Sequence, residues 1–295
     1  MSVFAKLKSL FASKGPRVDL EKRFQTIMRV GQGSMSKLWK ARDFKSGRTV
    51  ALKVLDMAII KRQEQRMKRA YGGKLPPSEG ELSIGLKHEN IVSTLDWGMS
   101  TKDEIFLVME FIEGIGLNFL VETKDPRLTG KRFNYLLQAA DGLAYMHEQK
   151  LIHRDLNPRN MMVTPDDALK LIDFGLAVPN TPDFRRPGNR TGSINYMAPE
   201  LMKRNPIDER IDVFSYGVTC YEVLVGRFPW EATESTERMK QHMNMPPQDP
   251  KKVNADIDDE LAKLLVRGIA QDPKKRIPNM KEFAEALRSL ERQDY

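Results

Sequence analysis

The first part of the chain contains short apolar runs with the length and alternation expected of β-strands. Residues with turn-forming chemistry separate them, among them Gly31, Gly33 and the pair Ser46-Gly47. Closely spaced strands joined by such turns predict an antiparallel sheet. The strand-like runs are 26–30, 37–41, 49–55, 91–96 and 105–111.

Beyond Gly114 the apolar positions recur every three to four residues, which is the period of a helix with one buried face. This pattern predicts helices over 133–149, 212–225, 260–270 and 280–292. A strand-rich front followed by a helix-rich back predicts an α+β fold with two lobes.

The first 23 residues have a pattern of their own. Apolar side chains recur at helical spacing with lysines between them, and Gly15-Pro16 ends the run. We expect a basic amphipathic helix that packs on its own domain or, alternatively, meets a membrane surface or a partner. The apolar positions are Val3, Phe4, Leu7, Leu10 and Phe11.

Composition narrows the class of protein. The 295 residues are 40% hydrophobic and 30% charged, which excludes a disordered or fibrous chain. Wholly apolar runs such as 105–109 fall far short of the roughly 20 residues that span a bilayer. A single cysteine, Cys220, forms no internal disulfide, and no secretory signal pattern opens the chain, so we expect a cytoplasmic location without a transmembrane segment.

The net charge of +8 is concentrated in two places. Residues 1–23 carry six Lys or Arg against two acidic residues, and residues 61–74 carry six against one. Because the rest of the chain is close to neutral and Tyr71 is the one aromatic within 61–74, nucleic-acid binding is disfavoured. The 61–74 segment is expected to be a solvated loop or helix.

Gly31-Gln32-Gly33 lies between two predicted strands, where glycines allow a backbone to approach phosphates closely. Alone it is a weak signal, since ordinary hairpin turns share it. The motif is followed by Val50-Ala-Leu-Lys53, His153-Arg-Asp155, Asn160, Asp173-Phe-Gly175 and Ala198-Pro-Glu200.

In that order and spacing, these motifs resemble the eukaryotic-like protein kinase catalytic domain of serine/threonine type. The resemblance covers residues 24–290 and implies a bilobal fold, with an antiparallel-sheet N-lobe at 24–112, a mainly helical C-lobe at 113–290 and a tail at 291–295. It also implies transfer of the γ-phosphate of ATP, with Mg²⁺ or alternatively Mn²⁺, to Ser/Thr hydroxyls of protein substrates.

The resemblance assigns roles to five residues. Lys53 would hold the α- and β-phosphates and pair with Glu79 of helix αC. Asp155 would orient the acceptor hydroxyl and accept its proton. Asn160 and Asp173 would hold the metal ion, because Mg²⁺ prefers hard oxygen ligands.

Further residues would bind the nucleotide or support the fold. Met109 would be the gatekeeper and 110–112 the hinge beside the adenine. Asp212 would brace the catalytic loop, and Arg276 would pair with Glu200. The nucleotide contacts implied by the family are Val30, Gly31, Gln32, Gly33, Ser34, Leu38, Ala51, Lys53, Glu110, Ile112 and Met162.

Some positions depart from the family pattern. Ser36 replaces the third loop glycine, and Asn157 replaces the lysine that serine/threonine members direct at the γ-phosphate. Arg159 stands where many tyrosine members place an arginine, and would reach the same oxygens. The loss of a cation near the transition state supports one rival function, a pseudokinase that binds nucleotide or partners without efficient transfer.

Helix αC is also unusual. Glu79 follows Lys53 by 26 residues, Gly80 and Gly85 weaken the helix, and Ser83 falls where a spine of apolar residues expects Leu or Met. We therefore expect the active position of αC to need support, from a partner docked on αC or on residues 1–23, or from a phosphate on the activation loop.

Two features concern the acceptor and the activation loop. Thr191-Gly192-Ser193 resembles the segment of serine/threonine members that receives the acceptor, whereas Arg159 favours the tyrosine type; we expect Ser/Thr. Arg154, directly before Asp155, marks members whose loop is ordered by a phosphate. The predicted phosphosite is Thr191, with Thr181 as the second candidate.

Overall fold

The computed structural model describes residues 16–32, 36–187, 190–231 and 235–290. They divide into two units. The first takes the chain up to Gln65 together with Ser83–Gly85 and Ser93–Ile112, and the second takes Arg66–Leu82, Leu86–Val92 and the chain from Glu113 onwards. The predicted helix within 1–15, the loop residues Gly33 and Ser34, and the tail 291–295 lie outside the described residues.

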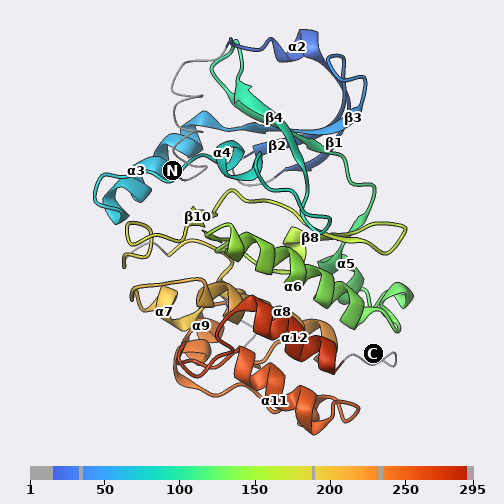
Figure 1. Cartoon of the computed structure of the whole chain (residues 1–295), viewed down its shortest axis with the longest axis vertical. Helices are drawn as coiled ribbons and strands as arrows, with labels where there is room; N and C mark the ends of the chain where they lie inside the picture. Colours follow the sequence, from blue (N-terminus) through green and yellow to red (C-terminus); the bar gives the residue numbers. More distant parts are fainter. Residues whose placement is uncertain (1–15, 33–35, 188–189, 232–234, 291–295) are drawn as a thin grey trace. The chain divides into compact units, whose positions relative to one another are not determined.

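The first unit is built on one antiparallel sheet of five strands in the order β1-β2-β3-β5-β4. Figure 1 shows this sheet, with β1, β2, β3 and β4 labelled. A short helix, α2 (Leu20–Arg23), precedes the sheet and is capped by the Asp19 carboxylate. The strands are β1 (Phe24–Gln32), β2 (Ser36–Asp43), β3 (Thr49–Leu55), β4 (Thr94–Met99) and β5 (Ile105–Glu110).

The apolar core of this unit covers one face of the sheet. Alternate residues of a strand point to opposite faces, so Val50 and Leu52 enter the core while Ala51 and Lys53 belong to the other face. Leu38 is directly opposite Lys53 and shares its face. The buried members of the core are Phe24, Ala41, Val50, Leu52, Phe106 and Val108.

The predicted strand at 91–96 begins three residues too early. Ile91 and Val92 are buried, but they pair with the second unit: Ile91 forms a parallel bridge with Leu171, and the Val92 N–H donates to the Leu171 carbonyl at 2.9 Å. Strand β4 of the first unit starts at Thr94, two residues after Val92. The apolar pattern identified the burial correctly and assigned it to the wrong sheet.

The second unit is mainly helical, and the four predicted helices are confirmed within a few residues. They are α6 (Arg132–Glu148), α8 (Arg210–Val225), α11 (Asp259–Gly268) and α12 (Met280–Ser289). The residues directly before the last two helices, Asp258 and Asn279, cap the helix N-termini with their side chains. Further helices in the described part of this unit are α5 (Leu117–Glu122), α7 (Pro199–Met202), α9 (Ser235–Asn244) and α10 (Pro250–Val253).

Gly217 and Gly268 let α8 and α11 approach closely. A Cβ at Gly217 would lie 2.9 Å from the Gly268 carbonyl carbon, so no side chain fits between the two backbones. The surroundings explain why α8 is apolar on nearly all sides: most of its residues are buried.

Short strands carry the loops of this unit. β6 (Ile115–Gly116), β8 (Met161–Val163) and β9 (Leu169–Leu171) form one small antiparallel sheet, and β7 (Leu151–Ile152) pairs with β10 (Val178–Pro179). An antiparallel sheet followed in sequence by helices confirms the predicted α+β class.

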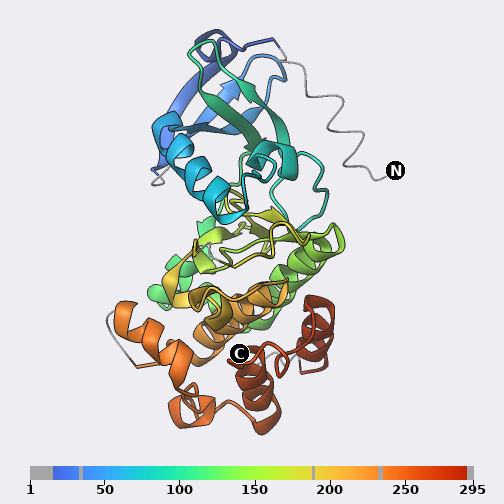
Figure 2. The same ribbon diagram turned by 90° about the vertical axis from the view of Figure 1, so that its left-hand side faces the viewer.

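The basic segment is largely helical. α3 (Met57–Ala70) is one unbroken helix after β3 (Figure 2), and the boundary between the two units falls within it. The helix that carries Glu79, α4 (Glu79–Ser83), is only five residues long. The weak helix predicted from Gly80 and Gly85 is therefore present as little more than one turn.

Candidate active site

The loop after β7 is held by a buried carboxylate. Asp212, on the first turn of α8, accepts the backbone N–H groups of His153 at 2.7 Å and Arg154 at 2.8 Å, and lies 2.9 Å from His147 Nε2. The predicted bracing role of Asp212 is confirmed. Although burial by itself raises the pKa of Asp212, the hydrogen bond and charge of His147 and the loop N–H groups hold that pKa below its usual value.

Two groups from different parts of the chain orient the Asp155 carboxylate. Its Oδ1 accepts the backbone N–H of Ser193 at 2.7 Å, and its Oδ2 lies 3.3 Å from Asn160 Nδ2, which also donates to the Asp155 carbonyl at 2.7 Å. Gly192 permits the first contact: it has φ +127°, and a Cβ there would lie 2.7 Å from the Arg154 carbonyl oxygen. The structure thus brings together Asp155 and Asn160, two residues of the predicted site.

Asn157 has a structural place in the same loop. Its side chain is 2% exposed, caps the short 3₁₀ turn Pro158–Asn160 by accepting the Arg159 N–H, and donates to the Asp155 carbonyl at 2.9 Å. Arg159 itself is exposed. Replacing the family's lysine with Asn157 therefore removes a cation and adds a bond that fixes the loop.

Asp173 and Glu79 meet around one glycine of the second unit. Asp173 Oδ1 accepts the Gly175 N–H at 3.1 Å, and a Cβ on Gly175 would lie 3.4 Å from Glu79 Oε2. Asp173 has φ +67° and Arg154 has φ +69°, a conformation that costs a non-glycine residue energy and is concentrated at functional sites. Phe174 packs edge-on against His153, with ring centroids 5.6 Å apart.

The remaining predicted nucleotide residues, apart from Met162, belong to the first unit. Leu38, Ala51 and Lys53 share the sheet face opposite the core. Lys53 therefore lies in a different unit from Glu79, and their pairing stays a prediction. The other residues of the first unit implied by the family lie on or beside β1 and β5: Val30, Gly31, Gln32, Glu110 and Ile112.

A cavity of about 670 Å³ opens in the first unit on the other face of its sheet. It is lined by Trp39, Leu52 and Val54 among others, which alternate with Leu38, Ala51 and Lys53 along the strands. This cavity is therefore not the predicted nucleotide site.

Ser83 is buried, as an apolar residue at its position would be, but its hydroxyl oxygen accepts a hydrogen bond from Thr94 Oγ1 at 2.7 Å. The polar substitution is satisfied locally within the first unit. A buried hydroxyl with a partner costs far less than one without.

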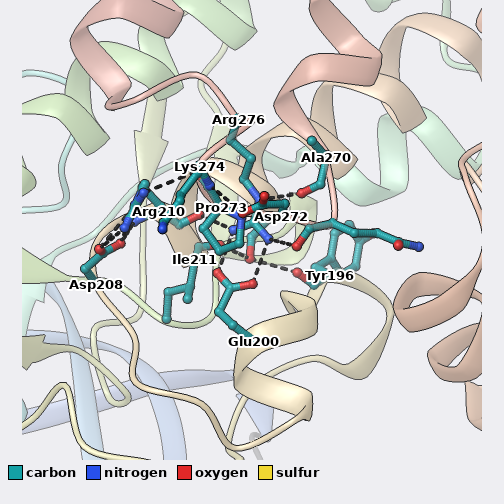
Figure 3. Close-up of polar contacts among 12 residues, drawn as sticks. Tyr196, Glu200, Asp208, Arg210, Ile211, Ala270, Asp272, Pro273, Lys274 and Arg276 are labelled. Carbon is teal, nitrogen blue, oxygen red and sulfur yellow. Dashed lines mark hydrogen bonds and ion pairs between the residues drawn. The ribbon is translucent and has the colours of Figure 1, made fainter.

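An ion pair joins α7 to the segment that precedes α12 (Figure 3). The guanidinium of Arg276 binds both carboxylate oxygens of Glu200, each at 2.6 Å, and donates to the carbonyls of Ala270 and Arg210. Both side chains are buried. The predicted pair is confirmed, and its extra bonds satisfy the donors that a buried guanidinium must place.

The protein kinase domain family model matches residues 24–288. The chain belongs to the protein kinase family. It is 30% identical over 285 residues to serine/threonine-protein kinase PknA of Corynebacterium glutamicum, covering 92% of this chain and 57% of that protein. It is 27% identical over 277 residues to pkn3 of Myxococcus xanthus, covering 90% and 49%, and 31% identical over 239 residues to mouse Aurora kinase C, covering 80% and 82%.

These comparisons confirm the resemblance to serine/threonine protein kinases. The chain spans about half the length of the bacterial relatives it matches. We call residues 153–160 the catalytic loop and residues 173–200 the activation segment, after the family's names for the segments that carry these motifs. None of the helices among the described residues has the length and apolar character that a membrane span requires.

Kinase family membership implies ATP and a divalent metal ion. The donor chemistry of Asn160 and Asp173 fits such an ion: Asp173 offers carboxylate oxygens, and Asn160, whose amide nitrogen is turned towards Asp155, offers its Oδ1. No cluster of three or more His, Cys, Asp or Glu residues suited to a metal occurs in the described ranges. A kinase metal needs none, because phosphate oxygens supply further ligands.

Proposed function

We propose that the chain is an active kinase that transfers the γ-phosphate of ATP to Ser/Thr hydroxyls of protein substrates. The observation that carries this proposal is the geometry of Asp155, whose carboxylate is oriented by the Ser193 N–H of the activation segment and by Asn160 of the catalytic loop. A general base must be fixed within reach of the acceptor, and this arrangement supports that role.

In the proposed reaction, Asp155 accepts the proton as the acceptor O–H bond breaks. The acceptor oxygen then bonds to the γ-phosphorus, and the bond to the leaving ADP oxygen breaks with its electron pair. Lys53 would hold the α- and β-phosphates and pair with Glu79, and Arg159 would contact the transferring phosphate. When bound, the divalent ion neutralises phosphate charge; we propose Mg²⁺, held by Asn160 and Asp173.

The serine/threonine kinases among the relatives support a Ser/Thr acceptor, and two contacts fix the segment that would receive it. Ser193, in the segment that would receive the acceptor, lies 3.4 Å from Asn157 Nδ2, and the Tyr196 hydroxyl donates to Glu222 at 2.5 Å. The first contact holds the segment on the loop residue Asn157, and the second holds it on α8. Phosphorylation of Thr191 or Thr181, a docking partner at αC or at residues 1–23, and a cytoplasmic location stay predictions.

The second candidate is a pseudokinase, and it rests on Asn157 and α4. Asn157 supplies no cation to the transition state, and α4 offers only one turn to position Glu79. Under this alternative the chain would bind nucleotide without efficient transfer.

One experiment separates the two. Purified chain is incubated with γ-labelled ATP, Mg²⁺ or Mn²⁺ and a mixture of Ser/Thr and Tyr peptides, and the products are mapped by mass spectrometry. Transfer to Ser/Thr that disappears in Asp155→Ala, while that variant still binds ATP, supports the kinase. Nucleotide binding with equal background labelling in wild type and Asp155→Ala supports the pseudokinase.

A further inference from the structure

Tyr71 is buried between the catalytic loop and the activation segment, although it belongs to neither. It directly follows α3, its side chain is 1% exposed, and its hydroxyl accepts a hydrogen bond from Arg154 Nη1 at 2.9 Å. Its ring packs edge-to-face with the ring of Phe184 in the activation segment, with ring centroids 5.1 Å apart and ring planes at 85°. One side chain therefore touches both parts.

The turn after Tyr71 fixes this placement. Gly72 and Gly73 have φ +62° and +88°, and the Gly73 N–H donates to the Lys68 carbonyl at 2.7 Å, which closes the end of α3 in the manner of a Schellman motif. Only glycine adopts such consecutive values without strain. The Gly72-Gly73 pair thus ends the helix at the point where Tyr71 reaches Arg154.

Charged contacts join the same turn to the activation segment. Lys74 Nζ lies 2.6 Å from Asp183, and Asp183 also faces Arg186 at 3.6 Å. The guanidinium of Arg186 lies against Gly72, because a Cβ there would be 2.8 Å from its Nη1. The segment around Phe184 is therefore held by apolar, charged and close-packing contacts to residues 71–74.

Arg154 needs such a partner because it is buried. Its side chain is 3% exposed, and its Nη2 also donates to Thr191 Oγ1 at 3.4 Å. A buried guanidinium is costly unless its donors are placed. Its position also matters for chemistry, since Arg154 is adjacent to Asp155, and Thr191 is two residues from the Ser193 N–H that orients the Asp155 carboxylate.

We propose that Tyr71 is a positioning residue that orders the activation segment of the unphosphorylated chain by holding Arg154 and Phe184. Its hydroxyl accepts a hydrogen bond from Arg154 Nη1. By resemblance, a phosphate on the activation segment would bind this same guanidinium. The proposal rests on the proposed function for its kinetic consequence, whereas its structural consequence is independent of catalysis.

The test compares Tyr71→Phe, which keeps the ring and loses the hydroxyl, with Tyr221→Phe. The matched control loses a tyrosine hydrogen bond to the Gln248 carbonyl, which belongs neither to the catalytic loop nor to the activation segment. All proteins are treated with phosphatase and checked by mass spectrometry. Hydrogen exchange of residues 177–187, kcat and KM for ATP, and melting temperature are then measured.

In Tyr71→Phe we expect faster exchange of 177–187 and a kcat lower by about tenfold at unchanged KM for ATP, which is the effect of losing one hydrogen bond to a charged group. Tyr221→Phe should leave the exchange of 177–187 and kcat as in wild type. A purely structural role for Tyr71 would lower the melting temperature of Tyr71→Phe as much as that of Tyr221→Phe and leave 177–187 protected, and this result would overturn the proposal.

The failure of the two proposals can be told apart. If wild type transfers no phosphate, the proposed function fails, and the exchange of 177–187 still decides the role of Tyr71. If wild type is active only before phosphatase treatment, a phosphate rather than Tyr71 orders the segment, and the positioning proposal is wrong while the kinase proposal stands.

Discussion

Asn157 shows how a single departure from a family pattern acquires a different meaning in the structure. By sequence it is a missing cation, whereas in the fold it is a buried cap whose amide holds the Asp155 carbonyl. The side chain that replaces a lysine thus contributes to the geometry of the catalytic loop. If the missing charge decides the rate of transfer, restoring the lysine raises that rate; if loop geometry decides it, restoring the lysine lowers it.

We expect Asn157→Lys to lower transfer, because it removes the cap at Arg159 N–H and forces an ammonium into a buried place. Transfer rates should fall at least about tenfold, and the free energy of unfolding should drop by about 1–2 kcal/mol through the lost cap. Arg159→Ala, measured in parallel, should also reduce kcat if the exposed guanidinium contacts phosphate. A gain of activity in Asn157→Lys with full activity in Arg159→Ala would contradict both statements.

Asp212 gives a pH-dependent prediction. Its pKa in the folded chain is below the unfolded value of about 3.9, so its contribution to stability is complete above that pH and is lost as the pH falls through the folded-state pKa. Asp212→Asn should lower the free energy of unfolding at pH 7 by about 3 kcal/mol.

Urea unfolding at several pH values measures this effect. The difference between wild type and Asp212→Asn should narrow below about pH 4 as the carboxylate is protonated. Asp141→Asn is the control, because Asp141 forms an exposed ion pair with Arg288. A deficit of Asp212→Asn that stayed constant down to the lowest usable pH would show that the charge is not what holds the loop.

At the scale of elements, the pair Glu200–Arg276 joins a four-residue helix to a distant loop. α7 is too short to be stable alone, and the bidentate bond fixes it to the segment before α12. Removing the arginine leaves a buried carboxylate without its bidentate partner. We expect Arg276→Met to cost about 3–5 kcal/mol of unfolding free energy, measured by chemical denaturation.

The exposed pair of Arg288 with Asp141 supplies the comparison for that experiment. Its two side chains are about half exposed, and Arg288→Ala should change the unfolding free energy by less than about 1 kcal/mol. Equal losses in Arg276→Met and Arg288→Ala would mean that burial of the first pair gives it no special importance.

Elements were predictable where one local pattern decides them. The run 49–55 became β3 without error, and the period of 212–225 identified α8. The run 91–96 failed because burial alone cannot say which sheet a strand joins, and Ile91 pairs with Leu171, 80 positions along the chain. Residues 61–74 stayed open between loop and helix, since their three apolar residues, Met67, Ala70 and Tyr71, give only a weak helical period among the charged ones.

At the scale of the whole molecule, the order of the motifs predicted the family and drew attention to Asp155, Asn160 and Asp173. It did not identify Tyr71. In sequence Tyr71 is an isolated aromatic in a basic segment, and its contact with Arg154 joins residues 83 positions apart. Gly72-Gly73 was the available signal, because two glycines after a charged helix mark a turn that some tertiary contact requires.

Metal-dependent nucleotide binding can be measured as a change in the stability of the whole chain. A ligand that binds only the folded state stabilises it by about 2.7 kcal/mol at a concentration one hundred times its Kd. For a domain of this size, that free energy corresponds to a rise of roughly 5–10 °C in melting temperature. We therefore expect ATP with Mg²⁺ to raise the melting temperature of the chain more than ATP with a chelator.

Asp173→Asn should remove this metal-dependent part, because an amide oxygen replaces the carboxylate while size and shape are kept. ATP with Mg²⁺ and ATP with chelator should then stabilise the variant to the same small extent. Asp166→Asn makes the same change of charge at an exposed turn residue and should keep the wild-type response. If Asp173→Asn also kept it, the metal ion would have to bind the folded chain through residues other than Asp173.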